Sequence, residues 1–574
     1  MKVLLIYPYW LEERLLTEDV AVVPIGVYYV AALLKENGYD TEILNWHNIN
    51  ETPDKISEIL LEKKPDVIGF SILQANRWGG IEIARIAKAI DPDVKIAFGG
   101  SSPTFLWAHF LTHFPEIDFV VVGEGEYPFL NLVKCIEKSD DTLLENINGI
   151  AFRKDGRIIR TKDAEPIRNL DELPNPAKYF EYQHLCLTRG CTGKCKFCGS
   201  PKFWGARIRS HSADYFIEQL ELLYHKGVTF FYFSDDTFTF NKKDVIEICK
   251  RIIEKNLNIA WVAISRVNFV SEAVVYWMRK AGCIQISYGV ESGSEKIRKI
   301  LNKKMNADQI EKAFAVTAAY GILPRAYFIY GSPGERPETI RETIDLIGKI
   351  KPLVIHFFIL SIFPGTALYS EYKKKFNMTD DIWLERIEEI KYFETDSRLS
   401  REQVLAFGRE LRSTYYAHLP AIVEDIHLVD QEELFPLHSD FFSRLGMTFD
   451  QGDYSQIDVI KDKEKIAEKL YTKALTYYPT PRAYLGLGIL KQKAGDYEAS
   501  IDILSKGIVS FQQNMQLNLC LGISYMNIGA FDKALSHFLQ FQDYREALGF
   551  IVHCYEAMGE NEKASQFRKK LQFI

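Results

Sequence analysis

The stretch TRGCTGKCKFCGSP, residues 188–201, decides how the rest of the sequence is interpreted. It places Cys191, Cys195 and Cys198 within eight residues, with three residues between the first pair and two between the second. Thiolates are soft ligands that suit iron–sulfur clusters and zinc. A structural zinc site needs four ligands; no second CxxC pair follows, although Cys186 or His184 could complete one. Three thiolates on a four-iron cluster would leave one iron open to chelate a small molecule.

The cysteine loop opens a region of alternating strands and helices, residues 183–365. After the loop, we expect strands at Val228–Phe233, Ala260–Ile264, Ile284–Val290, Pro324–Tyr330 and Val354–Leu360. Six β/α units that begin at the cysteine loop predict a (β/α)6 partial barrel of parallel strands. Active sites in such barrels lie on loops at the carboxyl ends of the strands, and the cysteine loop has this position.

Residues 1–140 have the same alternation with a different distribution of glycines. The apolar runs are Val3–Tyr7, Thr41–Leu44, Val67–Ser71, Lys95–Phe98 and Phe119–Val122, with helical patterns such as Gly26–Glu36 and Ile81–Ile90 between them. Strands buried on both faces indicate an α/β fold with a doubly wound parallel sheet. Ser71, Gly99–Gly100 and Gly123–Gly125 come at the ends of these runs, where such sheets bind ligands.

The remaining segments are less regular. Residues 141–182 read as a linker that packs between domains, with a hairpin at RKDGRIIRTKD (153–163). Residues 366–455 form a helical extension rich in aromatic residues, which we expect to cover the site: Tyr392, Phe393, Tyr415, Tyr416, Phe441 and Phe442. In 456–574 the pair Gly488 and Gly522 is 34 residues apart, as are Gly495 and Gly529. A helix–turn–helix period of this length resembles tetratricopeptide repeats, although an ordinary all-α bundle remains an alternative.

The composition excludes several classes of protein. A net charge of −7 argues against a general nucleic-acid binder, and no apolar run approaches the length of a membrane span. The N-terminus reads as a buried strand rather than a signal peptide, so we expect a cytoplasmic protein. Nine cysteines in 574 residues are no disulfide framework. Five of them are expected to be small buried residues: Cys135, Cys249, Cys283, Cys520 and Cys554.

The cysteine string resembles the cluster motif of the radical S-adenosylmethionine (SAM) superfamily, and the resemblance extends over 183–365. It implies a [4Fe–4S] cluster on the three cysteines and a SAM molecule on the open iron. It places Phe197 against the adenine. By the same resemblance, Ser234, Asp235 and Asp236 follow the strand whose end contacts the SAM amino group. The string GVESGS (289–294) matches the next SAM-contacting strand end, with Gly289, Glu291 and Ser292 as the contacts.

Two later motifs support the resemblance less strongly when each is taken alone. YGSPGE (330–335) and FPGTAL (363–368) match further landmarks of the subgroup, but their glycines and prolines also suit plain turns. Arg207 and Arg209 follow the cysteine loop. Either they pair with carboxylates of SAM or substrate, or they are surface charges.

The N-terminal region resembles the cobalamin-binding domain that precedes many radical SAM domains. The resembling strings are PIGVYYVAALLKENGYDTEIL, DVIGFSI, IAFGGSSPT and DFVVVGEGEYPF. The resemblance implies that cobalamin contacts Ser71, Gly99, Gly100, Gly123, Glu124 and Gly125. The DxHxxG loop whose histidine ligates cobalt is missing, because the corresponding residues 72–80 read ILQANRWGG. Either cobalamin binds without a histidine on its lower face, or the domain has lost the cofactor.

Together these resemblances imply a cobalamin-dependent methyltransferase that uses SAM twice. One SAM methylates cobalamin. A second SAM yields a 5′-deoxyadenosyl radical, which abstracts hydrogen from an unactivated carbon of the substrate. The resulting substrate radical then takes the methyl group from methylcobalamin. An alternative is radical oxidation or ring formation, as in the anaerobic magnesium-protoporphyrin ester cyclases. A third, from another class, is a repeat-based scaffold with a degenerate enzyme core. Expected partners are a small-molecule or carrier-bound substrate, a flavodoxin or ferredoxin as electron donor, and a protein on the repeats.

Overall fold

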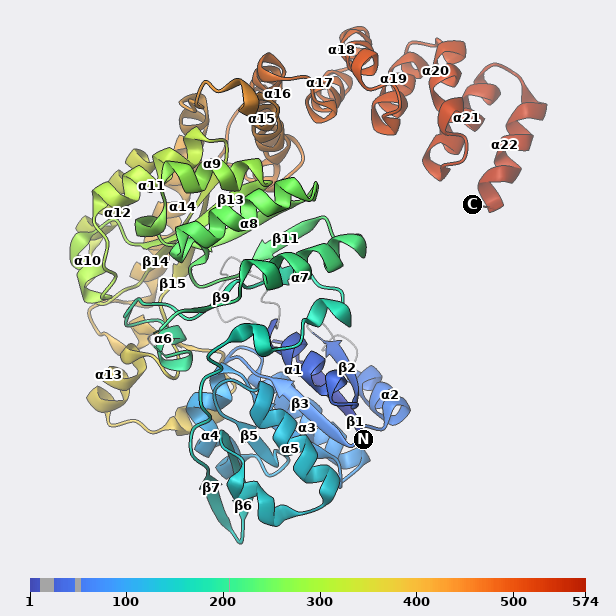
Figure 1. Cartoon of the computed structure of the whole chain (residues 1–574). Helices are drawn as coiled ribbons and strands as arrows, with labels where there is room; N and C mark the ends of the chain where they lie inside the picture. Colours follow the sequence, from blue (N-terminus) through green and yellow to red (C-terminus); the bar gives the residue numbers. More distant parts are fainter. Residues whose placement is uncertain (11–24, 47–52, 206, 574) are drawn as a thin grey trace. The chain divides into compact units, whose positions relative to one another are not determined.

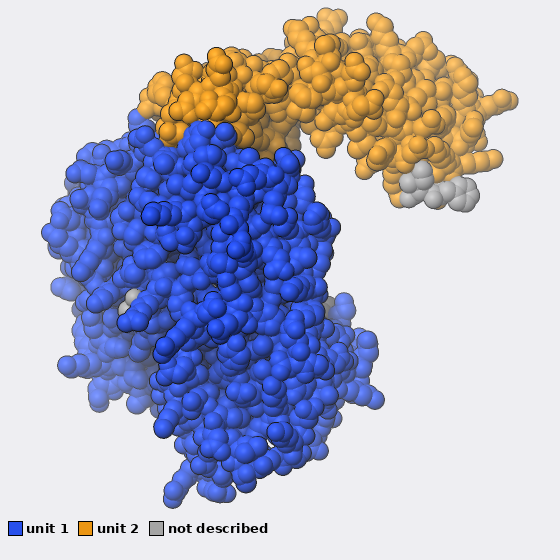
Figure 2. Space-filling model, in the orientation of Figure 1, with its two compact units in different colours: residues 1–316, 324–412 blue, residues 317–323, 413–574 orange. Residues whose placement is uncertain are grey.

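The computed structural model describes residues 1–10, 25–46, 53–205 and 207–573. The chain divides into two compact units (Figure 2). The first unit comprises residues 1–316 and 324–412, and the second comprises residues 317–323 and 413–574. The fold is mixed α/β with parallel strands in the first unit, and all-helical in the C-terminal region (Figure 1).

The first sheet has the strand order β2-β1-β3-β4-β5-β6-β7. Its parallel strands, at the five expected positions, are β1 (Lys2–Tyr7), β2 (Asp40–Asn45), β3 (Val67–Ser71), β4 (Lys95–Gly99) and β5 (Phe119–Val121). The helices between and after them are α1 (Ile25–Glu36), α2 (Pro53–Lys63), α3 (Arg77–Ile90), α4 (Ser101–His113) and α5 (Glu126–Lys138). Leu4 and Ile6 pack in one core cluster, whereas Val3 and Leu5 pack in another. Because successive strand residues point to opposite faces, both faces of the sheet are buried.

The expected hairpin forms and extends this sheet. Its strands are β6 (Ile150–Lys154) and β7 (Arg157–Arg160), and β6 pairs antiparallel with β5. An exposed strand edge leaves backbone groups unpaired. The hairpin therefore supplies hydrogen-bond partners to the three-residue strand β5.

The second sheet has the order β15-β14-β13-β12-β11-β8, so its strands lie side by side in the order of the chain. The strands are β8 (His184–Leu185), β11 (Phe230–Phe233), β12 (Ala260–Ser265), β13 (Cys283–Glu291), β14 (Leu323–Tyr330) and β15 (Val354–Ile359). The main helices between them are α7 (Ala213–His225), α8 (Lys242–Glu254), α9 (Glu272–Lys280), α11 (Ala307–Ala319) and α12 (Pro337–Ile350). The short strands β9 (Thr188–Arg189) and β10 (Arg209–Ser210) flank the cysteine loop as a separate antiparallel pair.

After the second sheet the chain adds short elements and a long helix. These are β16 (Ser361–Ile362), α13 (Ala367–Phe376), the 3-10 helix η7 (Asp380–Leu384), β17 (Ile390–Lys391) and α14 (Arg401–Glu424). The aromatic residues that suggested a covering segment divide between the units. Tyr415 and Phe442 are buried and contact Tyr454 and Tyr477 within the second unit. These side chains form a helical core and do not cover a site.

The C-terminal helices are α15 (Phe435–Asp450), α16 (Lys463–Tyr477), α17 (Pro481–Lys493), α18 (Tyr497–Ser510), α19 (Met515–Asn527), α20 (Phe531–Phe538), α21 (Arg545–Ala557) and α22 (Asn561–Phe573). The 34-residue glycine spacing has a packing reason. A Cβ at Gly488 would lie 2.6 Å from the side chain of Leu504, and a Cβ at Gly522 would lie 2.4 Å from Phe538. In each pair, the missing side chain lets the following helix approach closely. Cys520 is half-buried, whereas the other four cysteines expected in the core are buried. Among the described residues, no helix is long and apolar enough to cross a membrane.

Candidate functional site

The cysteine loop is held in place by a buried carboxylate at the end of β11. Asp235 accepts hydrogen bonds from the backbone N–H of Leu187 (3.2 Å) and of Thr188 (2.6 Å), and from the Thr188 hydroxyl (2.6 Å). Both carboxylate oxygens are therefore already occupied by the start of the loop. Burial raises the pKa of Asp235 to about 7, because a low-dielectric environment disfavours the charged form.

The neighbours of Asp235 face other polar groups. Ser234 lies 2.9 Å from Nδ1 of His184, and its hydroxyl sits at the carboxyl end of β11. Asp236 is exposed and accepts a hydrogen bond from the Ser200 hydroxyl, two residues beyond Cys198. Of the two carboxylates expected near SAM, Asp236 is thus the more accessible, and Asp235 shapes the loop.

The three thiols of the loop are half-buried and lie among polar groups. The sulfur of Cys191 accepts a hydrogen bond from the Gly193 N–H at 3.4 Å and lies 4.0 Å from Nη1 of Arg266. Burial raises the pKa of Cys195, whereas the positive charges of Lys303 and Arg266 lower it. Burial also raises the pKa of Cys198 to about 12. Metal binding releases these protons, because the ligand form of cysteine is the thiolate.

The spacing of the thiols argues against a single metal ion. Among the described residues, the one group of three or more potential ligands whose atoms all lie within 4.8 Å is His109, His113 and Asp381. The cysteines are therefore not gathered around one point, as the ligands of one zinc ion at about 2.3 Å would be. In a four-iron cluster each thiolate binds a different iron, so a wider spacing suits the cluster.

The end of β13 carries a second polar group of the site. Glu291 forms an ion pair with Lys303 at 2.8 Å, and both side chains are buried. Glu291 has φ +68°, which is unusual for a residue with a side chain. A Cβ at Gly289 would lie 2.4 Å from the Glu291 carboxylate. Gly289 therefore makes room for this ion pair, which explains the glycine two residues before the glutamate.

Ser292 follows Glu291 and forms hydrogen bonds that stabilise the neighbouring backbone. Its hydroxyl accepts a hydrogen bond from the N–H of Ser294 and lies 3.4 Å from the hydroxyl of Thr343. Its carbonyl accepts a hydrogen bond from Arg298. Ser292 is buried within this network, so it supports the strand end rather than lining the open site.

A cavity of about 560 Å³ adjoins the ends of both sheets. Phe197 and Glu291 line it from the side of the cysteine loop, and Gln74 and Ser102 line it from the first sheet. Its apolar wall includes Tyr327, Ile329, Phe358 and Phe363, and Glu388 and Glu389 line another part of it. This volume is within the usual range of small-molecule sites.

A smaller cavity of about 130 Å³ lies at the carboxyl edge of the first sheet. All six residues expected there line it: Ser71, Gly99, Gly100, Gly123, Glu124 and Gly125. Gly123 has φ +81°, and a Cβ there would meet no atom within 4 Å. The glycines therefore leave open backbone on which a large ligand can lie closely.

A buried ion-pair network, which no sequence motif indicates, joins this edge to the cysteine loop. Arg189 pairs with Glu126 (2.6 Å) and Glu124 (3.1 Å), and Arg209 pairs with Glu124 (2.8 Å). The Arg189 guanidinium also lies over the rings of Tyr29 and Trp204. Arg209 is not a surface charge, because its side chain is 13% exposed and pairs with Glu124. Arg207 is exposed.

The fold and the site define a class of enzyme in which one cavity has walls from two parallel sheets, one followed by a cysteine loop and the other with a glycine-rich strand edge. The B12 binding domain family matches residues 18–133, and the radical SAM superfamily matches residues 185–347. An uncharacterized methyltransferase of Pyrococcus horikoshii is 30% identical over 421 residues, 70% of this chain and 90% of that protein. The anaerobic magnesium-protoporphyrin IX monomethyl ester cyclase of Rubrivivax gelatinosus is 29% identical over 376 residues, 62% of this chain and 67% of the cyclase.

A solved structure has the same fold. It is the radical S-adenosylmethionine methyltransferase TsrM from Kitasatospora setae with cobalamin and a [4Fe–4S] cluster bound. It aligns with a TM-score of 0.57 at 16% identity, covering 82% of this chain and 99% of TsrM. The chain therefore belongs to the radical SAM enzymes that carry a B12 binding domain, and its cofactors are a [4Fe–4S] cluster, SAM and cobalamin.

Proposed function

We propose that this enzyme transfers a methyl group to an unactivated carbon of a small molecule bound in the 560 Å³ cavity. When bound, the cluster and SAM supply a 5′-deoxyadenosyl radical for hydrogen abstraction, and cobalamin carries the methyl group. A radical reaction needs a site from which water is excluded. The apolar wall of the cavity, which includes Tyr327 and Ile329 of β14 and Phe358 of β15, would exclude water from that side of a bound substrate.

The observation that carries the proposal is that one cavity has walls from both cofactor domains. Phe197 and Glu291 contribute from the cysteine loop and from β13, while Gln74 contributes from the loop after β3 and Ser102 from the first turn of α4. A substrate in this cavity would lie close to both sets of residues. Methyl transfer needs this arrangement, because the activated carbon has to meet the methyl donor.

We propose that Cys191, Cys195 and Cys198 hold the cluster and are the metal ligands. The donor set fits, since three thiols on one loop are too far apart for a single ion and suit separate irons. Phe197, Ser234 and Asp236 are the proposed contacts to SAM on this side of the site. Gly289 and Glu291 contribute from β13. Asp235 and Ser292 support these residues from behind.

Cobalamin is proposed to lie on the glycine edge, at Ser71, Gly99, Gly100, Gly123, Glu124 and Gly125. The side chain of Gln74 supports this fit. It is buried, its Oε1 accepts a hydrogen bond from Ser102, and its Nε2 has no hydrogen-bond partner. Gln74 lies in the loop where other cobalamin proteins carry a ligating histidine. The Gln74 amide would then be a hydrogen-bond donor to a bound cobalamin.

The test is an analysis of the products of SAM. The anaerobically reconstituted protein is incubated with SAM and a low-potential reductant, with and without hydroxocobalamin. Mass spectrometry then quantifies 5′-deoxyadenosine and S-adenosylhomocysteine. The proposal expects both products, with S-adenosylhomocysteine formed only when the corrin is present. Absence of S-adenosylhomocysteine under both conditions would contradict methyl transfer.

Radical oxidation or ring formation is the second candidate. The similarity to the Rubrivivax gelatinosus cyclase favours it, because it extends over 376 residues and so spans both cofactor domains. This reaction would yield 5′-deoxyadenosine without S-adenosylhomocysteine. The same product analysis therefore separates the two candidates.

We also propose the domain organisation and partners. Residues 1–140 form the cobalamin domain with a doubly wound sheet, residues 141–182 a linker, and 183–365 a (β/α)6 partial barrel. Residues 366–455 are a helical extension, and 456–574 are tetratricopeptide-like repeats. The repeats are supported by Gly495, Gly529 and Gly559, which all have φ near +77° at a helix end. A flavodoxin or ferredoxin is the proposed electron donor, and the repeats are the proposed surface for a protein partner.

A further inference from the structure

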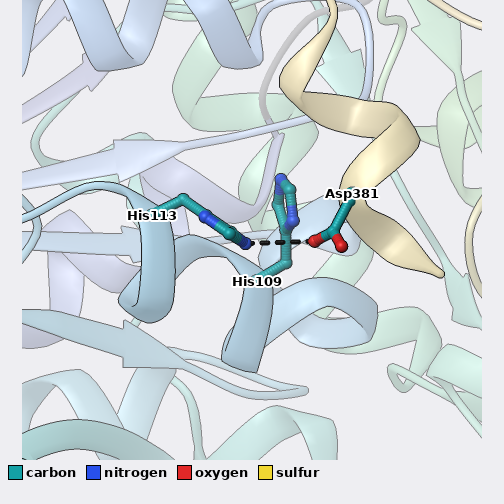
Figure 3. A group of neighbouring side chains, drawn as sticks. All are labelled: His109, His113 and Asp381. Atoms are coloured by element: carbon teal, nitrogen blue, oxygen red, sulfur yellow. Dashed lines mark hydrogen bonds and ion pairs between the residues drawn. The ribbon is translucent and has the colours of Figure 1, made fainter.

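Two histidines and a carboxylate converge at a place away from the cysteine loop (Figure 3). His109 and His113 are four residues apart on α4, so they lie on the same face of that helix. Asp381 comes from η7, and its carboxylate lies 3.2 Å from Nε2 of His113. The three ligand atoms all lie within 4.8 Å of one another.

His109 is the most informative of the three. Its side chain is only 6% exposed, and its Nδ1 has no hydrogen-bond partner. Burial lowers the pKa of His109 to about 4, and the positive charge of the nearby His113 contributes to this shift as the second cause. The imidazole is therefore neutral near pH 7, which is the form that binds metals. A buried polar nitrogen without a partner is costly, and a bound ion would satisfy it.

The surroundings of Asp381 and His113 also suit a cation. The Thr379 hydroxyl donates to Oδ2 of Asp381 at 2.8 Å, and Oδ1 faces His113. Such outer contacts orient a metal-binding carboxylate. His113 is the last residue of α4, where the helix dipole is negative. The 3.2 Å separation is close to the ligand–ligand distance of about 3.3 Å expected around tetrahedral zinc.

We propose that His109, His113 and Asp381 bind a divalent transition-metal ion, with zinc as the preferred ion and water as the fourth ligand. Two imidazoles and one carboxylate are a ligand set that zinc accepts. His113 is 30% and Asp381 60% exposed, so both side chains can turn toward an ion held by the buried His109. The exposed side also gives the ion a path of entry.

The ion would fasten residues 380–389 to the first sheet's domain. This segment already rests on α3, because the guanidinium of Arg77 donates to the carbonyls of Glu385, Ile387 and Glu388 and lies over the Trp383 ring. Its last residues, Glu388 and Glu389, line the large cavity. Zinc at its other end would hold this wall of the cavity against α4.

The experiment measures zinc binding to the full chain after cluster reconstitution, so that iron occupies the cysteines. Equilibrium dialysis against zinc chloride, followed by metal analysis, should give one zinc per chain in addition to the iron. Asp381→Asn and His113→Gln should each weaken zinc binding at least about tenfold. Zinc should raise the unfolding temperature of the wild-type chain but not that of Asp381→Asn.

His427→Gln is the matched control, because His427 is exposed beside Asp425 and has no third ligand near it within the described residues. It should bind zinc as the wild type does. Asp381 is largely exposed, so its substitution leaves the fold intact, which circular dichroism checks. Equal zinc retention by wild type and Asp381→Asn would overturn the proposal, as would equal loss in His427→Gln, which would indicate unspecific surface binding.

Discussion

The two parallel sheets use the same edge in different ways. Both present their functional residues at the carboxyl ends of the strands, as parallel sheets do. The first sheet presents glycine backbone, at Gly99, Gly100 and Gly123, around a cavity of 130 Å³. The second presents thiols, carboxylates and an aromatic ring on longer loops. Open backbone gives a large organic ligand surface to lie on, whereas a metal cluster needs side chains that form bonds to it.

Both edges bury charged groups. At the glycine edge Glu124 and Glu126 pair with Arg189, whereas the second edge has Asp235 beneath the cysteine loop and the buried Glu291–Lys303 pair beside it. Arg189 connects the two edges through Glu124 and Glu126. The comparison predicts that side-chain substitutions disable the second edge and that added side chains weaken ligand binding at the first.

The largest effect is expected from removing a thiol. Cys195→Ala should lose the cluster and all SAM-dependent activity, because two thiolates are left where three are needed. Iron analysis and the visible spectrum of the reconstituted protein measure this loss. Cys186→Ala is the control, since Cys186 donates to the Ser234 carbonyl and is not a proposed ligand. Full iron content in Cys195→Ala would contradict the ligand assignment.

The connection between the edges is expected to give the next largest effect. Arg189→Met leaves Glu126, only 4% exposed, without its partner. Breaking a buried ion pair by removing one member costs about 3–5 kcal/mol. The free energy of unfolding in urea should fall by this amount, and Glu126→Gln in the same chain should restore part of it. Arg207→Met, at an exposed position, should change the free energy of unfolding little. A loss there as large as that of Arg189→Met would mean that the network contributes nothing.

Asp235 should make stability depend on pH in an unusual direction. Its pKa is raised to about 7 in the folded protein and has its ordinary acidic value when unfolded. Between these two pKa values, Asp235 is ionised in the unfolded chain but keeps its proton in the folded protein. The folded state therefore loses stability as the pH rises. The loss is up to about 1.4 kcal/mol per pH unit. From pH 5 to pH 7, the free energy of unfolding in urea should therefore decrease less in Asp235→Asn than in the wild type. An identical decrease in both proteins would contradict the raised pKa.

The smallest effect is expected on the glycine edge. At Gly99 an added Cβ would make only ordinary contacts, 3.7 Å from Cβ of Val121, so Gly99→Leu should fold. The leucine would fill the small cavity and weaken corrin binding about tenfold, or about 1.4 kcal/mol. Titration with hydroxocobalamin measures this change. Gly348→Leu, on α12 with open space around it, is the control and should bind the corrin normally.

Much of this arrangement can be predicted from the sequence. The strands of both sheets are apolar runs with turn residues after them, and the cysteine spacing identifies the loop. Phe197 and Glu291 were also expected, and both line the large cavity. These features are local, because a strand or a ligand loop is specified by residues close together in the chain.

Other features depend on contacts between distant residues. Arg189 meets Glu126 across 63 positions, and Asp381 meets His113 across 268. The sequence marks neither partner, although the spacing of His109 and His113 was visible. The role of Asp235 could not be read from its position after a strand, because it depends on which way the carboxylate turns.

The most direct test of the two-edge account counts both metals in the same preparations. After anaerobic reconstitution with iron, sulfide and hydroxocobalamin, the wild type should contain about four irons and one cobalt per chain. The account predicts that Cys195→Ala loses iron and keeps cobalt, and that Gly99→Leu, at limiting hydroxocobalamin, loses much of its cobalt and keeps iron. If zinc replaced iron, if the wild type took up no cobalt, or if both variants lost both metals together, the account would be contradicted.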